Sequence, residues 1–179
     1  YPVQSQTSYA VTQDTKHFFV KDSEHPYIQK KPFLWTRGYQ VGGRSLTWGR
    51  WAYRRGDTDF ACYEADGIGI DWPIRYKDIE PWYDHVERFI GVSGNRDGLP
   101  QIPDGIFLPP WEMNCVEKHV EQKLRETYSH RRLTIGRTAN ITQPHNGRGK
   151  CMARNLCRRG CPYGAYFSAN AVTLPAAEK

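Results

Sequence analysis

Long loops separate the few regular elements that this sequence predicts. The clearest helix covers residues 76–90, where apolar side chains recur at steps of three or four and Gly91 provides a stop. The other expected elements are helices over 113–129 and 166–178 and short strands at Lys16–Val20 and Arg132–Thr142. Loops of this length usually bind or cover something. We therefore expect an α+β chain whose own hydrophobic core is small.

The sequence divides into four segments, which we interpret as one incomplete domain. Residues 1–34 are polar and irregular, and residues 35–70 are rich in glycine and arginine with interleaved aromatic side chains. Residues 71–142 carry two predicted helices and a predicted strand. Residues 143–179 hold a cysteine-rich loop followed by the C-terminal helix.

Charge and composition exclude several classes of protein. The 25 Lys and Arg residues outnumber the 19 Asp and Glu residues, which gives a net charge of +6. These basic residues are spread along the chain rather than concentrated on one element, so we expect no nucleic-acid partner. A bound anionic cofactor would account for the excess equally well. No apolar run approaches the roughly 20 residues that span a bilayer, so we expect no transmembrane segment.

The glycine- and arginine-rich segment has the features of a site for a large, flat anion. Gly42 and Gly43 let main chain approach a ligand closely, and their N–H groups suit a pyrophosphate. Ser45 adds a hydroxyl group and Trp48 a flat apolar surface. A tight turn beside exposed arginines is an equally simple interpretation. The dinucleotide fingerprint G-x-G-x-x-G is absent, so the chain carries no complete Rossmann nucleotide site.

Three blocks of the sequence resemble the glucose-methanol-choline (GMC) family of FAD oxidoreductases. The first covers Gly38–Trp48 and continues into Arg54-Arg55 and Asp59-Phe60. The second is the run from Trp72 to Tyr83, and the third is Gly160-Cys161-Pro162-Tyr163-Gly164-Ala165. They follow the family's order across most of residues 35–175. The chain is most similar to the branch that contains pyranose 2-oxidase and the bacterial sugar dehydrogenases.

The resemblance implies a fragment of a GMC-type flavoprotein that lacks the N-terminal Rossmann unit. It implies that the 35–70 segment contacts FAD through Val41, Gly42, Gly43, Arg44, Ser45, Thr47 and Trp48. Thr47 lies where some members carry a histidine bonded covalently to the flavin, so we expect non-covalent FAD. The family's catalytic histidine would lie outside these 179 residues, and none of the six histidines here matches a catalytic position.

The most specific cluster of reactive side chains in the sequence consists of Cys151, Cys157 and Cys161. They fall within eleven residues among several arginines, which favour the thiolate form, and Pro162 follows the last of them. The resemblance implies a three-iron, four-sulfur cluster here, which would pass electrons from the flavin towards a cytochrome. Zinc, with His145 or Cys115 as a fourth ligand, is an alternative. A further alternative is that the cysteines are free thiols or that two of them form a disulfide.

We therefore expect part of an oxidoreductase that oxidises a CH–OH group of a sugar or related alcohol by hydride transfer to FAD. Its partners would be the remainder of the enzyme or a companion subunit, the alcohol, and a cytochrome acceptor. The rival interpretations are a non-catalytic electron-transfer or metal-binding module and a fragment without activity of its own. The sequence assigns no compartment, and the periplasm is compatible with it.

Overall fold

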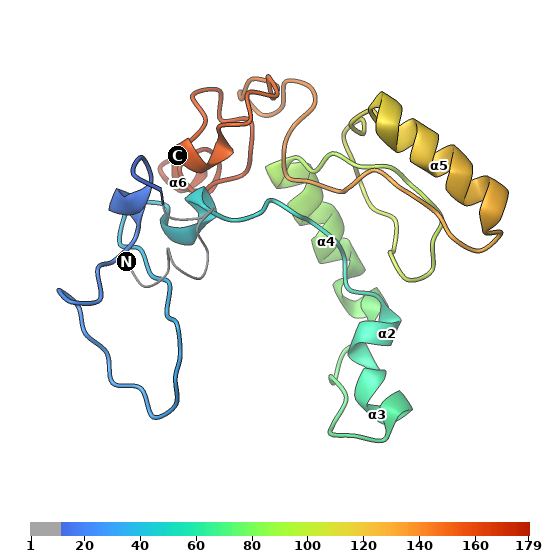
Figure 1. The fold of residues 1–179 in the computed structure, drawn as a ribbon, viewed down its shortest axis with the longest axis horizontal. Coiled ribbons are helices and arrows are strands. Elements are labelled where there is room, and N and C mark those ends of the chain that lie inside the picture. Colours follow the sequence, from blue (N-terminus) through green and yellow to red (C-terminus); the bar gives the residue numbers. More distant parts are fainter. Residues whose placement is uncertain (1–11) are drawn as a thin grey trace. The chain divides into compact units, whose positions relative to one another are not determined.

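The computed structural model describes residues 12–179 (Figure 1), so the first eleven residues of the expected irregular segment 1–34 lie outside the described part. The chain forms two compact units. Residues 50–151 make up one unit, and residues up to 49 join residues 152–179 in the other. The expected cofactor segment 35–70 and the cysteine loop each contribute residues to both units. We describe each unit by itself.

The two clearest predicted helices are confirmed. Helix α4 covers Tyr76–Ile90, the predicted range, and helix α5 covers Cys115–Thr127, slightly less than predicted. Three short α-helices complete the set within residues 12–179: α2 (Asp57–Phe60), α3 (Cys62–Asp66) and α6 (Thr173–Ala177). None of the helices in the described part has the length and apolar character needed to cross a membrane.

Two carboxylates cap the start of helix α4. Side chains from a loop that is distant in sequence bind the carbonyls at its end. Asp57 accepts a hydrogen bond from the Tyr76 amide at 2.9 Å, and Asp78 accepts one from the Arg75 amide at 2.7 Å. The helix stops at Gly91, whose φ of 75° lies in the region that favours glycine. The last carbonyls of the helix accept hydrogen bonds from His145, Asn146 and Arg148. This clamp attaches the start of the cysteine loop to α4.

Helix α5 begins with a side-chain cap. The Asn114 carboxamide accepts hydrogen bonds from the amides of Val116 and Glu117, both at 2.9 Å, and the Glu117 carboxylate accepts one from the Asn114 amide at 2.7 Å. This reciprocal arrangement satisfies amides that the helix itself leaves without partners. It matters here because α5 has no buried residue to stabilise it.

Replacing Asn114 with alanine is expected to cost about 1 kcal/mol of local helix stability. Faster amide hydrogen exchange over the first two turns of α5 would report the loss. Lys118→Ala, an exposed change on the same helix, serves as the control. Equal exchange rates in the two variants would contradict the capping role.

The predicted strand Arg132–Thr142 is wrong as a strand, although its centre is extended. Among the described residues, this segment makes only isolated bridges, with Thr138 pairing with both Trp51 and Ser93. The Ser93 and Thr138 amides donate to each other's carbonyls at 2.8 and 2.9 Å, and Ala52 and Ala139 add bonds on the other side. Three chain segments therefore meet at Thr138, but each pairing is too short to form a named strand.

Two further predictions are wrong at the ends of the chain. Lys16–Val20 is not a strand: Lys16–Phe18 form a 3-10 helix, because Thr12 and Thr15 hold a turn there through main-chain and side-chain hydrogen bonds. The predicted helix over 166–178 shrinks to α6. Residues 166–169 are instead hydrogen-bonded to the glycine-rich loop, and long-range contacts of this kind override helical periodicity.

Polar and charged side chains share the buried core of the 50–151 unit equally with apolar ones. The Arg54 side chain is 1% exposed. It donates to both carboxylate oxygens of Glu87 at 2.8 and 2.6 Å, to Asp84, and to the Tyr76 hydroxyl group. Burial opposes the charge of Arg54, but these acceptors outweigh it and raise the pKa of Arg54; burial also raises the pKa of Tyr76. This network fixes α4 to the main chain around Arg54.

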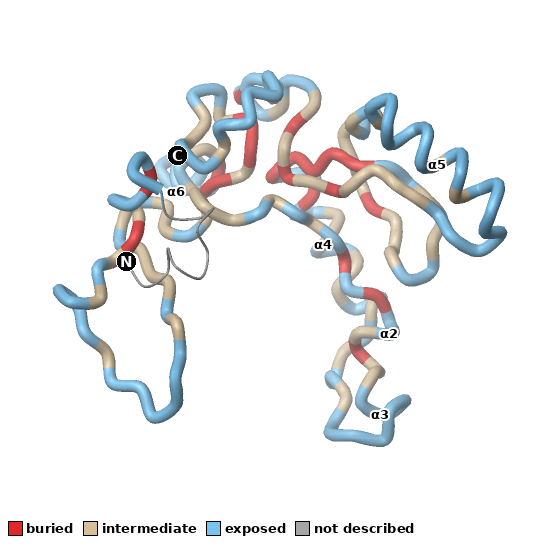
Figure 2. Tube along the Cα trace, viewed as in Figure 1, coloured by how far each residue is buried: buried red, intermediate tan, exposed pale blue. Residues whose placement is uncertain are grey.

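Several apolar side chains of both long helices remain exposed. Figure 2 shows α5 exposed along most of its length. On α4, Trp82, Val86 and Phe89 form a stripe with exposures of 68, 46 and 36%. The apolar residues of α5 are also largely exposed, with Val116 at 65%. The periodicity therefore predicts both helices correctly, but of its apolar positions only Ile90 is buried.

Candidate functional site

The Gly42-Gly43 pair forms a bend with positive φ angles at both residues. Gly42 has φ 88° and ψ −14°, and Gly43 has φ 51° and begins a 3-10 helix that ends at Leu46. The Gly43 amide donates to the Gln40 carbonyl at 2.9 Å, which closes the bend. Positive φ is costly for other residues, so the backbone itself requires glycine at this corner.

The two glycines have different surroundings. A Cβ atom on Gly42 would lie 1.9 Å from Oδ1 of Asn170, so Gly42 makes room for a side chain of this same chain. A Cβ atom on Gly43 would meet nothing within 4 Å. Only Gly43 therefore leaves an open face of main chain, and the close approach expected at Gly42 is made by Asn170.

The segment that follows the cysteines is hydrogen-bonded to the predicted cofactor loop. The Ser45 hydroxyl group accepts a hydrogen bond from the Ala169 amide at 2.9 Å, and Trp48 donates from its indole to the Phe167 carbonyl at 2.8 Å. The Tyr166 hydroxyl group donates to the Leu46 carbonyl at 3.1 Å. Ser45 and Trp48 thus hold the loop in place.

The remaining predicted residues lie at the surface of the loop. Val41 is 71% exposed, and the exposed Arg44 donates to the Thr36 carbonyl at 2.6 Å. The half-buried Thr47 donates to the Arg44 carbonyl at 3.4 Å. Val41, Gly43 and Arg44 are therefore the members best placed to meet a ligand.

The positive charge of the chain belongs entirely to the unit that carries this loop. The unit formed by residues 1–49 and 152–179 holds ten Lys or Arg and four Asp or Glu residues, which leaves +6. The 50–151 unit holds fifteen of each and is neutral. Because anions are drawn to positive potential, this asymmetry favours an anionic ligand at the first unit. The sequence alone showed the excess but not its location.

The three clustered cysteines fall on both sides of the unit boundary. Cys151 ends the 50–151 unit, where its amide donates to the Ile141 carbonyl at 2.9 Å and its sulfur accepts a long contact of 4.0 Å from the Asn140 carboxamide. Cys157 begins a 3-10 helix in the other unit, and the Cys161 sulfur accepts a hydrogen bond from the Ala165 amide at 3.4 Å.

All five cysteines lie in the described part of the chain and are free thiols. Within residues 12–179, no three His, Cys, Asp or Glu side chains form a set that could hold a metal ion. His145, the alternative zinc ligand, is engaged with the end of α4, and Cys115 is exposed at the start of α5. The structure thus holds the predicted cofactor loop together within one unit. The predicted metal ligands are divided between the two units and stay a prediction.

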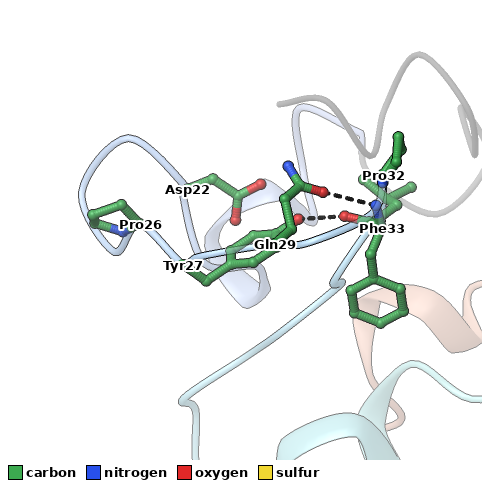
Figure 3. A pocket seen from close by; sticks show the side chains of 7 residues that line it. Asp22, Pro26, Tyr27, Gln29, Pro32 and Phe33 are labelled. Atoms are coloured by element: carbon green, nitrogen blue, oxygen red, sulfur yellow. Dashed lines mark hydrogen bonds between the residues drawn. The ribbon is translucent and has the colours of Figure 1, made fainter.

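An ordered loop over residues 20–37 adds a hollow that the sequence did not indicate. The hollow has a volume of about 540 Å³ and is lined by Tyr27, Gln29 and Phe33 among others (Figure 3). The Tyr27 hydroxyl group donates to the Phe33 carbonyl at 2.6 Å, and the Phe33 amide donates to Gln29 at 2.7 Å. The Val20 amide closes the loop by donating to the Arg37 carbonyl at 2.8 Å.

Comparison with known proteins identifies relatives that are all named as oxidases or dehydrogenases. The chain is 29% identical over 133 residues to the fructose dehydrogenase large subunit of Gluconobacter japonicus, covering 72% of this chain and 24% of the relative. It is 31% identical over 144 residues to paromamine 6'-oxidase of Streptomyces fradiae, covering 78 and 25%. It is 30% identical over 131 residues to 2-methyl-1,2-propanediol dehydrogenase of Mycolicibacterium austroafricanum, covering 70 and 23%. The chain spans about a quarter of the length of these relatives. No family model matches it.

Proposed function

We propose that this chain is part of a GMC-type FAD-dependent oxidoreductase that oxidises a CH–OH group of a sugar or related alcohol. The observation that carries the proposal is the similarity of most of the chain to enzymes named for oxidising fructose, paromamine and a propanediol. The exposed Gly43–Arg44 corner, on the unit that holds all of the excess positive charge, supports an anionic cofactor.

In this proposal, the corner at Gly43 holds the diphosphate of FAD. The missing Cβ of Gly43 leaves the main chain open to the ligand, and the neighbouring Arg44 supplies a guanidinium group with a geometry suited to phosphate oxygens. When bound, FAD supplies the chemistry by accepting a hydride from the carbinol carbon. Thr47 offers no group for a covalent bond to flavin, so the cofactor is held non-covalently. We assign no catalytic residue to these 179 residues.

Substitution of Arg44 tests the proposed cofactor site. Arg44→Ala in the longest polypeptide that carries this chain should weaken FAD binding by roughly 10- to 100-fold, because a charge-assisted hydrogen bond is lost. Titration of the apoprotein with FAD, followed by flavin fluorescence, measures the change. Lys30→Ala removes the same charge from the same unit and serves as the control. Equal affinities in both variants, or a wild-type protein that binds no flavin, would contradict the proposal.

A separate proposal concerns Cys151, Cys157 and Cys161. Three thiols at this spacing, two of them accepting N–H···S contacts, have the donor chemistry of an iron–sulfur loop, but the described residues hold no assembled ligand set. We therefore assign no step to a cluster. A companion subunit is consistent with the relative named as a large subunit, and a cytochrome would suit as the electron acceptor.

Metal analysis of the purified protein tests the cysteine proposal. A three-iron, four-sulfur cluster predicts iron together with acid-labile sulfide, and both should be lost in Cys161→Ser. Cys62→Ser, a cysteine outside the loop, should keep both. Bound zinc without sulfide, or a metal-free protein after anaerobic reconstitution with iron and sulfide, would contradict the cluster.

A further inference from the structure

The 50–151 unit contains a second hollow, about 330 Å³ in volume, that neither the cofactor loop nor the cysteines explain. It lies beside the start of α5 and the extended segment around Thr138. Its lining includes Trp51, Trp111, Met113 and Ile135, with Glu117, Thr134 and Thr138 as polar members. The volume lies in the range of roughly 300–1,000 Å³ that small-molecule sites occupy, and few polar groups in an apolar wall are typical of such sites.

Trp51 presents a flat, fixed surface at this hollow. A Cβ atom on Gly136 would lie 2.3 Å from the Trp51 ring, so the indole rests directly against the main chain there. The ring is also stacked on Tyr53, with centroids 6.0 Å apart and planes 17° apart. Trp51 nevertheless remains 61% exposed. An aromatic face held in this way is suited to the apolar face of a ring-shaped ligand.

Two polar groups complement this aromatic face. The Thr138 side-chain oxygen is buried and has no hydrogen-bond partner among the described residues. Leaving such a group unsatisfied costs about 1–3 kcal/mol, so a ligand hydroxyl group that reaches it after a side-chain rotation is favoured. The Glu117 carboxylate is fixed by its bond to the Asn114 amide, and its other oxygen can accept a second hydrogen bond.

We propose that this hollow binds a hydroxylated ring, a pyranose or a cyclitol, with one ring face against Trp51 and hydroxyl groups directed to Thr138 and Glu117. The inference deepens the proposed function by giving the class of alcohol that the protein recognises. It rests on that proposal for the oxidation of the ligand, but not for its binding.

Equilibrium binding of two non-reducing probes, methyl α-D-glucopyranoside and myo-inositol, tests the inference in the longest polypeptide that carries the chain. Saturation-transfer NMR and intrinsic tryptophan fluorescence provide the readouts. Trp51→Ala should weaken binding roughly tenfold. Trp82→Ala, an equally exposed tryptophan outside the hollow, should leave it unchanged. Thr138→Val keeps the shape and the main-chain bonds of Thr138 and should weaken binding several-fold.

Three results would overturn the inference: no binding of either probe, equal affinity in wild type and Trp51→Ala, or cyclohexane binding as tightly as myo-inositol. Flavin content, measured in the same samples, separates the two proposals. Probe binding by flavin-free protein supports the ring site and counts against the FAD proposal. Flavin-loaded protein that binds neither probe leaves the FAD proposal intact and overturns the ring site.

Discussion

Replacing Arg54 with alanine is expected to destabilise the 50–151 unit by about 3–5 kcal/mol, because removal of one partner leaves buried charge without compensation. Glu87 is the group most affected: its side chain is 6% exposed, and it also accepts a hydrogen bond from the Ile106 amide at 2.7 Å. Glu87 therefore joins α4 both to Arg54 and to the loop at residues 105–106. Denaturant unfolding, followed by tryptophan fluorescence, measures the loss.

The neighbouring arginine offers a matched control. Arg55 pairs with Asp59 at 3.1 Å, but its side chain is 73% exposed. Exposed pairs contribute about 0–1 kcal/mol, so Arg55→Ala should shift the unfolding midpoint little. Arg54→Lys should restore only part of the stability, since lysine keeps the charge but not the two-pronged bond to Glu87. Equal midpoints for Arg54→Ala and Arg55→Ala would show that the buried network is not needed.

Gly42→Val is expected to disrupt the predicted cofactor loop. A side chain at Gly42 combines an unfavourable positive φ with a clash against the Asn170 carboxamide, so the bend or the Asn170 side chain must move. Because Ser45 and Trp48 attach the same loop to residues 167–169, the displacement would extend to those contacts. In the longest polypeptide that carries the chain, we expect loss of bound FAD. The flavin-to-protein absorbance ratio after gel filtration measures it.

Two further variants separate the clash from the backbone strain. Gly43→Ala also places a side chain at positive φ, but in space that no other part of the chain fills, so it should disturb the contacts of the loop with residues 167–169 less than Gly42→Ala does, although its Cβ fills the corner proposed for the diphosphate. Adding Asn170→Gly to Gly42→Ala removes the clashing carboxamide and should restore part of the binding. If this second change restores nothing, the close approach of Asn170 is not what requires glycine at position 42.

Helix α4 shows what the sequence predicts well. Its range follows from apolar spacing and from Gly91, both of which act within a few residues. The clamp formed by His145, Asn146 and Arg148 on its last carbonyls could not be predicted in this way. It joins groups more than fifty residues apart, and no local pattern specifies such a pairing.

The incorrect predictions have the same cause, which is contact between segments distant in sequence. Residues 166–172 have a composition that suits a helix, but Tyr166 and the main chain of Phe167 and Ala169 bond to the glycine-rich loop. The cofactor loop was predicted from its residue types. The different surroundings of Gly42 and Gly43, however, depend on Asn170, which is distant in sequence. The hollow at Trp51 likewise needs Gly136 and Thr138 beside it, a contact that only the fold establishes.

The exposed stripe on α4 affects how mutations in this chain would be interpreted. Trp82 keeps 68% of its surface exposed in the described unit, so a polar replacement there removes few packed neighbours. Such a replacement should change the free energy of unfolding little when the chain is studied alone. Any fitness cost of such a replacement in a cell would therefore indicate that this stripe contacts another part of a larger assembly.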